Sequence, residues 1–177
     1  MMHWLENVGE SIPEHSIDVK TALYAAMKSD LLDEVDVHAC ALAAALASAN
    51  GELAFAIEMF GPLAKAKAEI RMAKTAVSVT NMHNVYDRFV AGSEAEFAHS
   101  GFEKPSNFSM KYEMYALAAS IIDYCTPAAN AHYRNLLDLG VTMPAIQQIA
   151  KIAAVINTIG KIAPEIDQLV PSAGLPE

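Results

Sequence analysis

The sequence predicts an all-α fold, and three observations support this prediction. The chain of 177 residues is 53% apolar and rich in alanine, a residue that loses no side-chain freedom in a helix. Leucine, methionine, lysine and glutamate, which also favour helix, recur throughout. Runs of alternating polarity rich in valine, threonine and tyrosine are missing. A chain of this length is expected to form one domain, 1–177, with a sizeable core of its own.

The helices are placed by apolar periodicity and by their start and stop signals. They are expected at 16–30, 31–51, 52–61, 62–92, 110–124, 127–140 and 143–163. Asn50-Gly51 stands where a left-handed residue ends a helix, and Pro62 and Pro127 suit first helical positions. The long helix that opens at Pro62 is expected to break near 81–84.

Three segments are expected to lack long helices. The opening 1–15 and the segment 93–109 are polar, and the second of these has room for one helical turn at most. The last segment, 164–177, holds three prolines and a glycine and is expected to form a loose tail.

Charge and hydropathy exclude several function classes. The formal net charge is −9, and such an excess of carboxylates repels phosphate, so nucleic-acid binding is not expected. The N-terminus lacks the basic opening and apolar core of a signal peptide. The longest stretch free of charged residues, Val37 to Gly51, is too short to span a membrane. We therefore expect a cytoplasmic protein that is not inserted in a membrane.

A faint internal repeat predicts a helix-pair duplication. At an offset of 75 residues, Ala41–Ala44 matches Ala116–Ala119 in four consecutive positions. Alanine-rich helices also match by chance, and the sequence leaves the two explanations open. In this register Asn50 corresponds to Cys125, and only the second unit carries a thiol at its break.

The two cysteines have different surroundings. Cys40 lies in an alanine-rich apolar helix, which predicts a small buried hydrophobic side chain. Two distant cysteines form neither a disulfide framework nor a zinc site, and no bound cofactor or metal is expected.

Cys125 lies at a predicted helix start, with Thr126 as the expected N-cap. Unpaired backbone N–H groups and the macrodipole stabilise an anion there, which favours a thiolate. At about 100° per residue, Ala128 and His132 share a helical face with Cys125. Glu113 lies on the preceding helix and can orient the imidazole of an acid–base relay. The alternative is an ordinary helix boundary with a buried cysteine, a surface histidine and a solvated glutamate.

The order and spacing of Glu113, Cys125, position 128 and His132 resemble the motif Glu…Cys-x-x-Cys-x-x-x-His of AhpD-like alkylhydroperoxidases, in the carboxymuconolactone decarboxylase-like superfamily. The resemblance extends to EHSIDVKTAL, NMHNVYDRF and HYRNLLDLGVTMPAI, and so covers nearly the whole chain. It implies that Cys125 matches the first motif cysteine and that Glu113 and His132 match the proton relay.

One motif position departs from the family. The cysteine that takes the peroxide oxygen in the family falls on Ala128. The resemblance therefore implies that this form lacks the peroxidatic sulfur and the intramolecular disulfide, so its own activity is in doubt. Either the natural protein has lost this cysteine, or Ala128 is an engineered replacement.

The resemblance also implies partners. It predicts a trimer or hexamer that reduces peroxides and the peroxiredoxin AhpC, with electrons from a lipoyl group on a 2-oxoacid dehydrogenase component. A second hypothesis is a non-redox helical oligomer that binds a small molecule, or decarboxylates a lactone with Glu113 and His132. A third is a structural partner of a peroxiredoxin. Ile146, Ile149, Ile152 and Ile156 form an apolar stripe that suits either the core or a subunit interface.

Overall fold

The computed structural model describes residues 3–91 and 109–162, and these residues form α-helices and short 3-10 turns without any strand. The all-α prediction is thereby confirmed. The elements are α1 (His3–Ser11), η1 (Glu14–Ser16), α2 (Ile17–Met27), α3 (Glu34–Ala47), α4 (Gly51–Phe60), η2 (Pro62–Lys65), α5 (Lys67–Ala91), α6 (Met110–Ile122), α7 (Thr126–Asp138) and α8 (Met143–Ile162). Among the described helices, none has the length and apolar character needed to cross a membrane.

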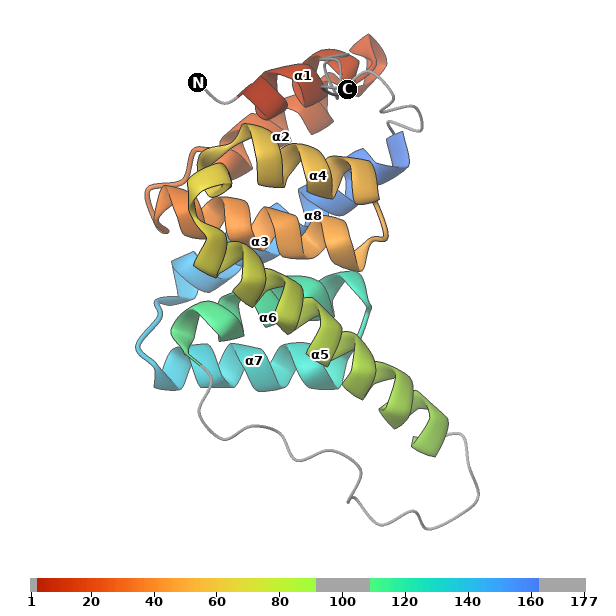
Figure 1. Cartoon of the computed structure of the whole chain (residues 1–177), viewed down its shortest axis with the longest axis vertical. Coiled ribbons are helices and arrows are strands. Elements are labelled where there is room, and N and C mark those ends of the chain that lie inside the picture. The colour runs from red at the N-terminus through yellow and green to blue at the C-terminus, as the bar shows by residue number, and fades with distance from the viewer. Residues whose placement is uncertain (1–2, 92–108, 163–177) are drawn as a thin grey trace, which may run out of the picture.

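Two central helices, α3 and α6, pack against each other, and α5 and α8 each contact both of them (Figure 1). The outer helix α4 packs on α3, and α7 packs on α6 in the same way. At the far end of the molecule, α1 contacts α4 and α2 contacts α8. The arrangement therefore consists of two similar helix pairs side by side.

The largely apolar sequences of α3 and α6 explain why these two helices occupy the interior. Most residues of both helices are buried, since a helix that is apolar on all sides is stable only inside a core. The stripe on α8 is buried within the single chain, so it belongs to the core. It comprises Ile146, Ile149, Ile152 and Ile156.

The breaks of the two helix pairs have the same backbone geometry at the predicted offset of 75 residues. Ala49 and Tyr124 are left-handed, with φ of 57° and 53°. In each break the two N–H groups after the helix bond back to its last turn, which is a Schellman motif. The geometry agrees with the register, while the common origin of the two units stays a prediction. The left-handed residue is Ala49 and not Asn50 or Gly51, because Asn50 serves as the N-cap of α4.

Two further predictions about element bounds were wrong. The opening segment forms α1, because Trp4, Leu5 and Val8 recur on one face and are buried. The expected break at 81–84 does not occur, and α5 continues to Ala91. There the Asn84 amide bonds to Asp123 at 3.1 Å instead of competing with its own helix backbone.

Two helix starts also differ from their predicted places. Pro62 opens the short turn η2, and the long helix α5 begins only at Lys67. The helix expected from residue 31 begins at Glu34, after Asp33 as N-cap residue. The predicted tail 164–177, and 93–108 of the polar segment, lie outside the described residues.

Candidate functional site

The candidate site lies where α6 ends and α7 begins. Cys125 is the N-cap residue of α7, with φ of −90° and ψ of 83°, and its side chain is half-buried. Its N–H donates to the Ser120 carbonyl at 3.1 Å, which closes the turn that ends α6. Thr126 was predicted as the N-cap but is already the first helical residue, because the turn after α6 places Cys125 at the boundary. Pro127, predicted at the first helical position, is instead the second residue of α7 and still lies in its first turn.

Glu113 and His132 form a direct pair between α6 and α7. The imidazole Nδ1 lies 2.7 Å from Glu113 Oε2, and Glu113 is only 3% exposed. Since a carboxylate oxygen accepts, His132 donates from Nδ1, and in the neutral ring Nε2 then carries the lone pair. The pair therefore fixes both the orientation and the tautomer of an imidazole that can take up a proton.

Asn135 completes the carboxylate's surroundings and was not predicted from the sequence. Its Nδ2 donates to the same Glu113 oxygen at 3.1 Å. His132 and Asn135 are three residues apart on α7, so they lie on neighbouring positions of one helical face. That spacing, with a side-chain amide after a candidate histidine, is the signal that could have identified Asn135.

The phenol beside the carboxylate stays protonated. Burial, together with the charge of Glu113, raises the pKa of Tyr112 to about 12. A neutral phenol adjacent to Glu113 adds no second negative charge to the site.

Position 128 lies one turn before His132 on α7, and Ala128 is half-buried. Residues four apart face the same side of a helix, so a side chain at 128 is a neighbour of the imidazole. Within the described residues, no hydrogen bond joins the Cys125 thiol to Glu113 or His132. By helical spacing, the imidazole of the Glu113–His132 pair is therefore a neighbour of position 128, and it has no hydrogen bond with Cys125.

Cys40 lies apart from this arrangement. It is fully buried in α3, and this burial, with the nearby charge of Asp36, raises the pKa of its thiol well above the usual range. The prediction of a buried hydrophobic cysteine is confirmed.

Polar contacts from α5 hold the break between α6 and α7. Asn84 bonds to the Asp123 carboxylate, and Arg88 Nη2 donates to the Asp123 carbonyl at 2.6 Å. This contact was not predicted from the sequence, because the residues around Asn84 indicate a helix break. These bonds hold Asp123, which lies two residues before Cys125.

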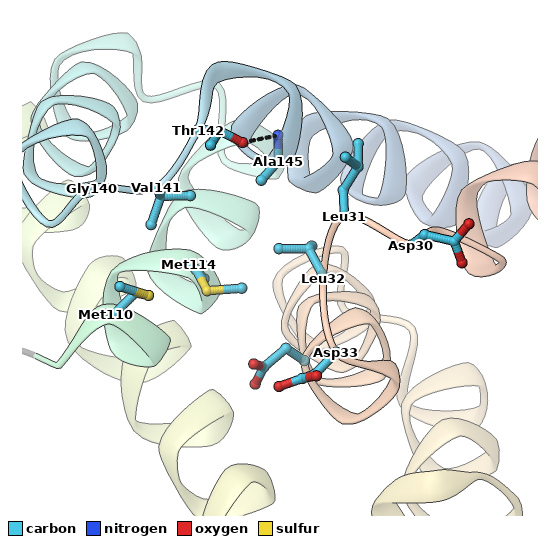
Figure 2. A pocket seen from close by; sticks show the side chains of 11 residues that line it. Asp30, Leu31, Leu32, Asp33, Met110, Met114, Gly140, Val141, Thr142 and Ala145 are labelled. Atoms are coloured by element: carbon cyan, nitrogen blue, oxygen red, sulfur yellow. Dashed lines mark hydrogen bonds between the residues drawn. The ribbon is translucent and has the colours of Figure 1, made fainter.

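A separate cavity of about 410 Å³ opens on another side of α6 (Figure 2). Three segments form it: the α2–α3 connection, the start of α6 and the α7–α8 connection. Its wall is apolar at Leu32, Met114 and Val141, and it also contains three aspartates, one of which is paired with a lysine. The volume is in the range of small-molecule sites. Sequence reasoning did not predict this cavity, since its walls come from three segments far apart in the chain.

A buried polar contact lies beside this cavity. Asp36, which lines it, accepts from the Tyr115 hydroxyl at 2.7 Å and pairs with Lys111 at 3.0 Å through the same oxygen, Oδ1. Burial and this hydrogen bond raise the pKa of Tyr115. The contact joins α3 to α6, and so helps to hold the two central helices together.

The sequence of the chain is similar to those of several known proteins that carry the same name. The chain is 28% identical to the alkyl hydroperoxide reductase AhpD of Bradyrhizobium sp. (strain BTAi1 / ATCC BAA-1182), over 88% of this chain and 90% of that protein. It is 29% identical to the protein of that name from Methylocella silvestris, over 93% and 97%. The Coxiella burnetii (strain Dugway 5J108-111) protein of that name is 28% identical, over 90% and 96%. No family model matches the chain.

Proposed function

Because the chain is AhpD-like, we propose that it is a thiol-dependent alkyl hydroperoxide reductase whose site is formed by Cys125, Glu113 and His132. In this proposal Ala128 stands where the peroxidatic cysteine acts. The observation that carries it is the pair formed by the buried Glu113 carboxylate and the half-buried His132 imidazole, 2.7 Å apart, which joins α6 to α7 beside the helix start at Cys125. Such a pair is the orienting part of a thiol-activating relay.

The reaction assigns a role to each group when position 128 carries a thiolate. The sulfur attacks one peroxide oxygen, an S–O bond forms, the O–O bond breaks, and the leaving alkoxide takes a proton through His132. The Cys125 thiol then attacks the sulfenic acid, which releases water and forms a disulfide. With Ala128 there is no sulfur to attack the peroxide and no sulfenic acid for Cys125 to attack. This form is therefore expected not to reduce peroxide.

Reduction of that disulfide defines the partners that we propose. A dithiol of the lipoyl type, on a 2-oxoacid dehydrogenase component, supplies two electrons and two protons. The oxidised peroxiredoxin AhpC is the protein substrate, and the functional form is a cytoplasmic homotrimer or hexamer. No bound metal, flavin or haem takes part in this scheme.

The experiment compares peroxide consumption by the present chain and by Ala128→Cys, with dihydrolipoamide as reductant. We expect turnover only in the variant, and we expect it to require Cys125. Absence of turnover in a folded Ala128→Cys protein would contradict the peroxidase assignment.

The second candidate is a non-redox binding or lactone decarboxylase function. Ala128 favours it, since neither function needs the second thiol, and the cavity of about 410 Å³ offers a place for a ligand. The aspartates of that cavity favour a cationic or neutral molecule over an anionic lactone. Saturable binding of n-hexylamine but not of hexanoate, with no peroxide turnover by Ala128→Cys, would favour the binding function.

A further inference from the structure

An exposed tyrosine directly precedes the thiol. Tyr124 is 76% exposed, although its neighbours on both sides are held in the turn between α6 and α7. Its φ of 53° is left-handed, a conformation that costs an ordinary L-residue about 1–2 kcal/mol. A bulky residue there is an outlier that asks for an explanation.

The turn itself does not require an aromatic ring. The chain ends α3, α6 and α7 with the same pattern of backbone hydrogen bonds, and the left-handed residues are Ala49, Tyr124 and Gly140. In two of the three turns the left-handed residue is alanine or glycine, the two smallest residue types. Burial does not explain the third, because most of the Tyr124 surface stays in contact with solvent.

A second exposed apolar residue lies in the stretch of α5 whose side chains bond to Asp123. Asn84 and Arg88 of α5 both bond to Asp123, the residue before Tyr124. Val85 lies in the helical turn between them and is 60% exposed. The residue before Cys125 is thus an exposed aromatic one with a left-handed backbone, and the helical turn that bonds to Asp123 carries an exposed aliphatic side chain.

We propose that Tyr124 is a specificity-determining residue, and that its ring, with Val85, binds an aromatic or branched apolar group attached next to the sulfur or oxygen atom that reacts at this site. The inference rests on the proposed thiol function and narrows its substrates to molecules with such a group. Tyr124 acts by contact with that group and takes no part in proton transfer.

Thiol exchange with two reagents of different size tests this directly. The Cys125 thiolate attacks the sulfide sulfur of benzyl or methyl methanethiosulfonate, a new S–S bond forms, and methanesulfinate leaves with the electron pair. The ratio of the two rate constants reports recognition of the ring, since the methyl reagent corrects for the reactivity of the thiol. Peptide mass spectrometry assigns the modification to Cys125 and not to Cys40.

We expect Tyr124→Gly to lower the benzyl-to-methyl ratio by about two- to twelvefold, the range of one aromatic contact. Tyr124→Asn, which tolerates the left-handed conformation, should lower it similarly, and Tyr124→Phe should preserve it. Ala49→Gly is the matched control at the equivalent turn and should leave the ratio unchanged.

Two outcomes would overturn the inference. One is an unchanged ratio in Tyr124→Gly and Tyr124→Asn. The other is a fall in melting temperature of more than a few degrees in Tyr124→Gly but not in Ala49→Gly, which would make the ring structural. Neither readout depends on peroxide turnover, so failure of the peroxidase assignment leaves this test intact.

Discussion

The two helix pairs, α3–α4 and α6–α7, have the same backbone conformation at their breaks but carry different side chains there. In α3–α4 the break residue Asn50 caps the next helix, since its side chain accepts from the Leu53 N–H at 2.9 Å. In α6–α7 the equivalent residue is Cys125, whose side chain makes no such bond. The capping interaction is typically worth about 0.5–2 kcal/mol. The second unit therefore carries a thiol where the first carries a stabilising cap.

The other three positions of the candidate site also differ between the two units. The residues of the first unit at these positions are buried and pack in the core, whereas Ala128 and His132 are only half-buried. In the offset of 75 residues, Glu113, Ala128 and His132 correspond to His38, Leu53 and Ile57. The backbone thus fixes where a break occurs, and four side chains decide whether the break is a structural joint or a candidate reactive site.

Replacement of the relay histidine should have the largest effect. In the Ala128→Cys background, His132→Gln removes the acid–base group, which typically contributes about 10²- to 10⁴-fold to rate. We expect a loss of peroxide turnover in that range, measured as kcat with dihydrolipoamide. Turnover within twofold of the parent background would show that the imidazole is not the relay.

Exchange of Leu53 and Ala128 residue types tests the packing difference. Leu53→Ala empties a fully buried position and should lower the free energy of unfolding by about 2–5 kcal/mol. Ala128→Leu adds a side chain at a half-buried position and should change it by less than about 1 kcal/mol. Denaturant unfolding measures both, and equal effects would contradict the contrast between the units.

Acid should lower the free energy of unfolding through His38, a buried residue of the first helix pair. This imidazole is fully buried, and desolvation lowers its pKa below the ordinary value of 6.5. Below about pH 6.5 the unfolded chain binds a proton that the folded chain does not, so stability is complete above that pH and falls below it. The slope is at most about 1.4 kcal/mol per pH unit. His38→Gln should flatten the dependence between pH 5 and 7, and an unchanged slope would contradict this assignment.

The smallest expected effect is a gain in stability at the site. Cys125→Asn gives the second unit the cap residue of the first and should raise the free energy of unfolding by about 0.5–2 kcal/mol. Thermal unfolding against the parent measures it, with Asn50→Cys as the reciprocal variant that should lose stability. A loss of stability in Cys125→Asn would show that the thiol itself is needed for packing.

The helical class and most helix positions could be predicted from the sequence, because local periodicity determines them, and so could the contact between Glu113 and His132. The helix α1 was missed although Trp4, Leu5 and Val8 recur on one face, because a segment of nine residues is stably helical only when that face packs against the rest of the fold. The continuity of α5 at Asn84 depends on a bond to Asp123, which is 39 residues away in the chain. Asn135 and the cavity likewise arise only when distant segments meet.

The most direct test of the central claim is the effect of Glu113→Gln on peroxide turnover in the Ala128→Cys protein, with dihydrolipoamide as reductant. Glutamine keeps the shape of the side chain but removes the charge that orients His132. We expect turnover to fall by about ten- to a hundredfold, less than the loss of the imidazole itself, while the protein stays folded. Unchanged turnover would contradict the claim that the Glu113–His132 pair is the working relay of this site.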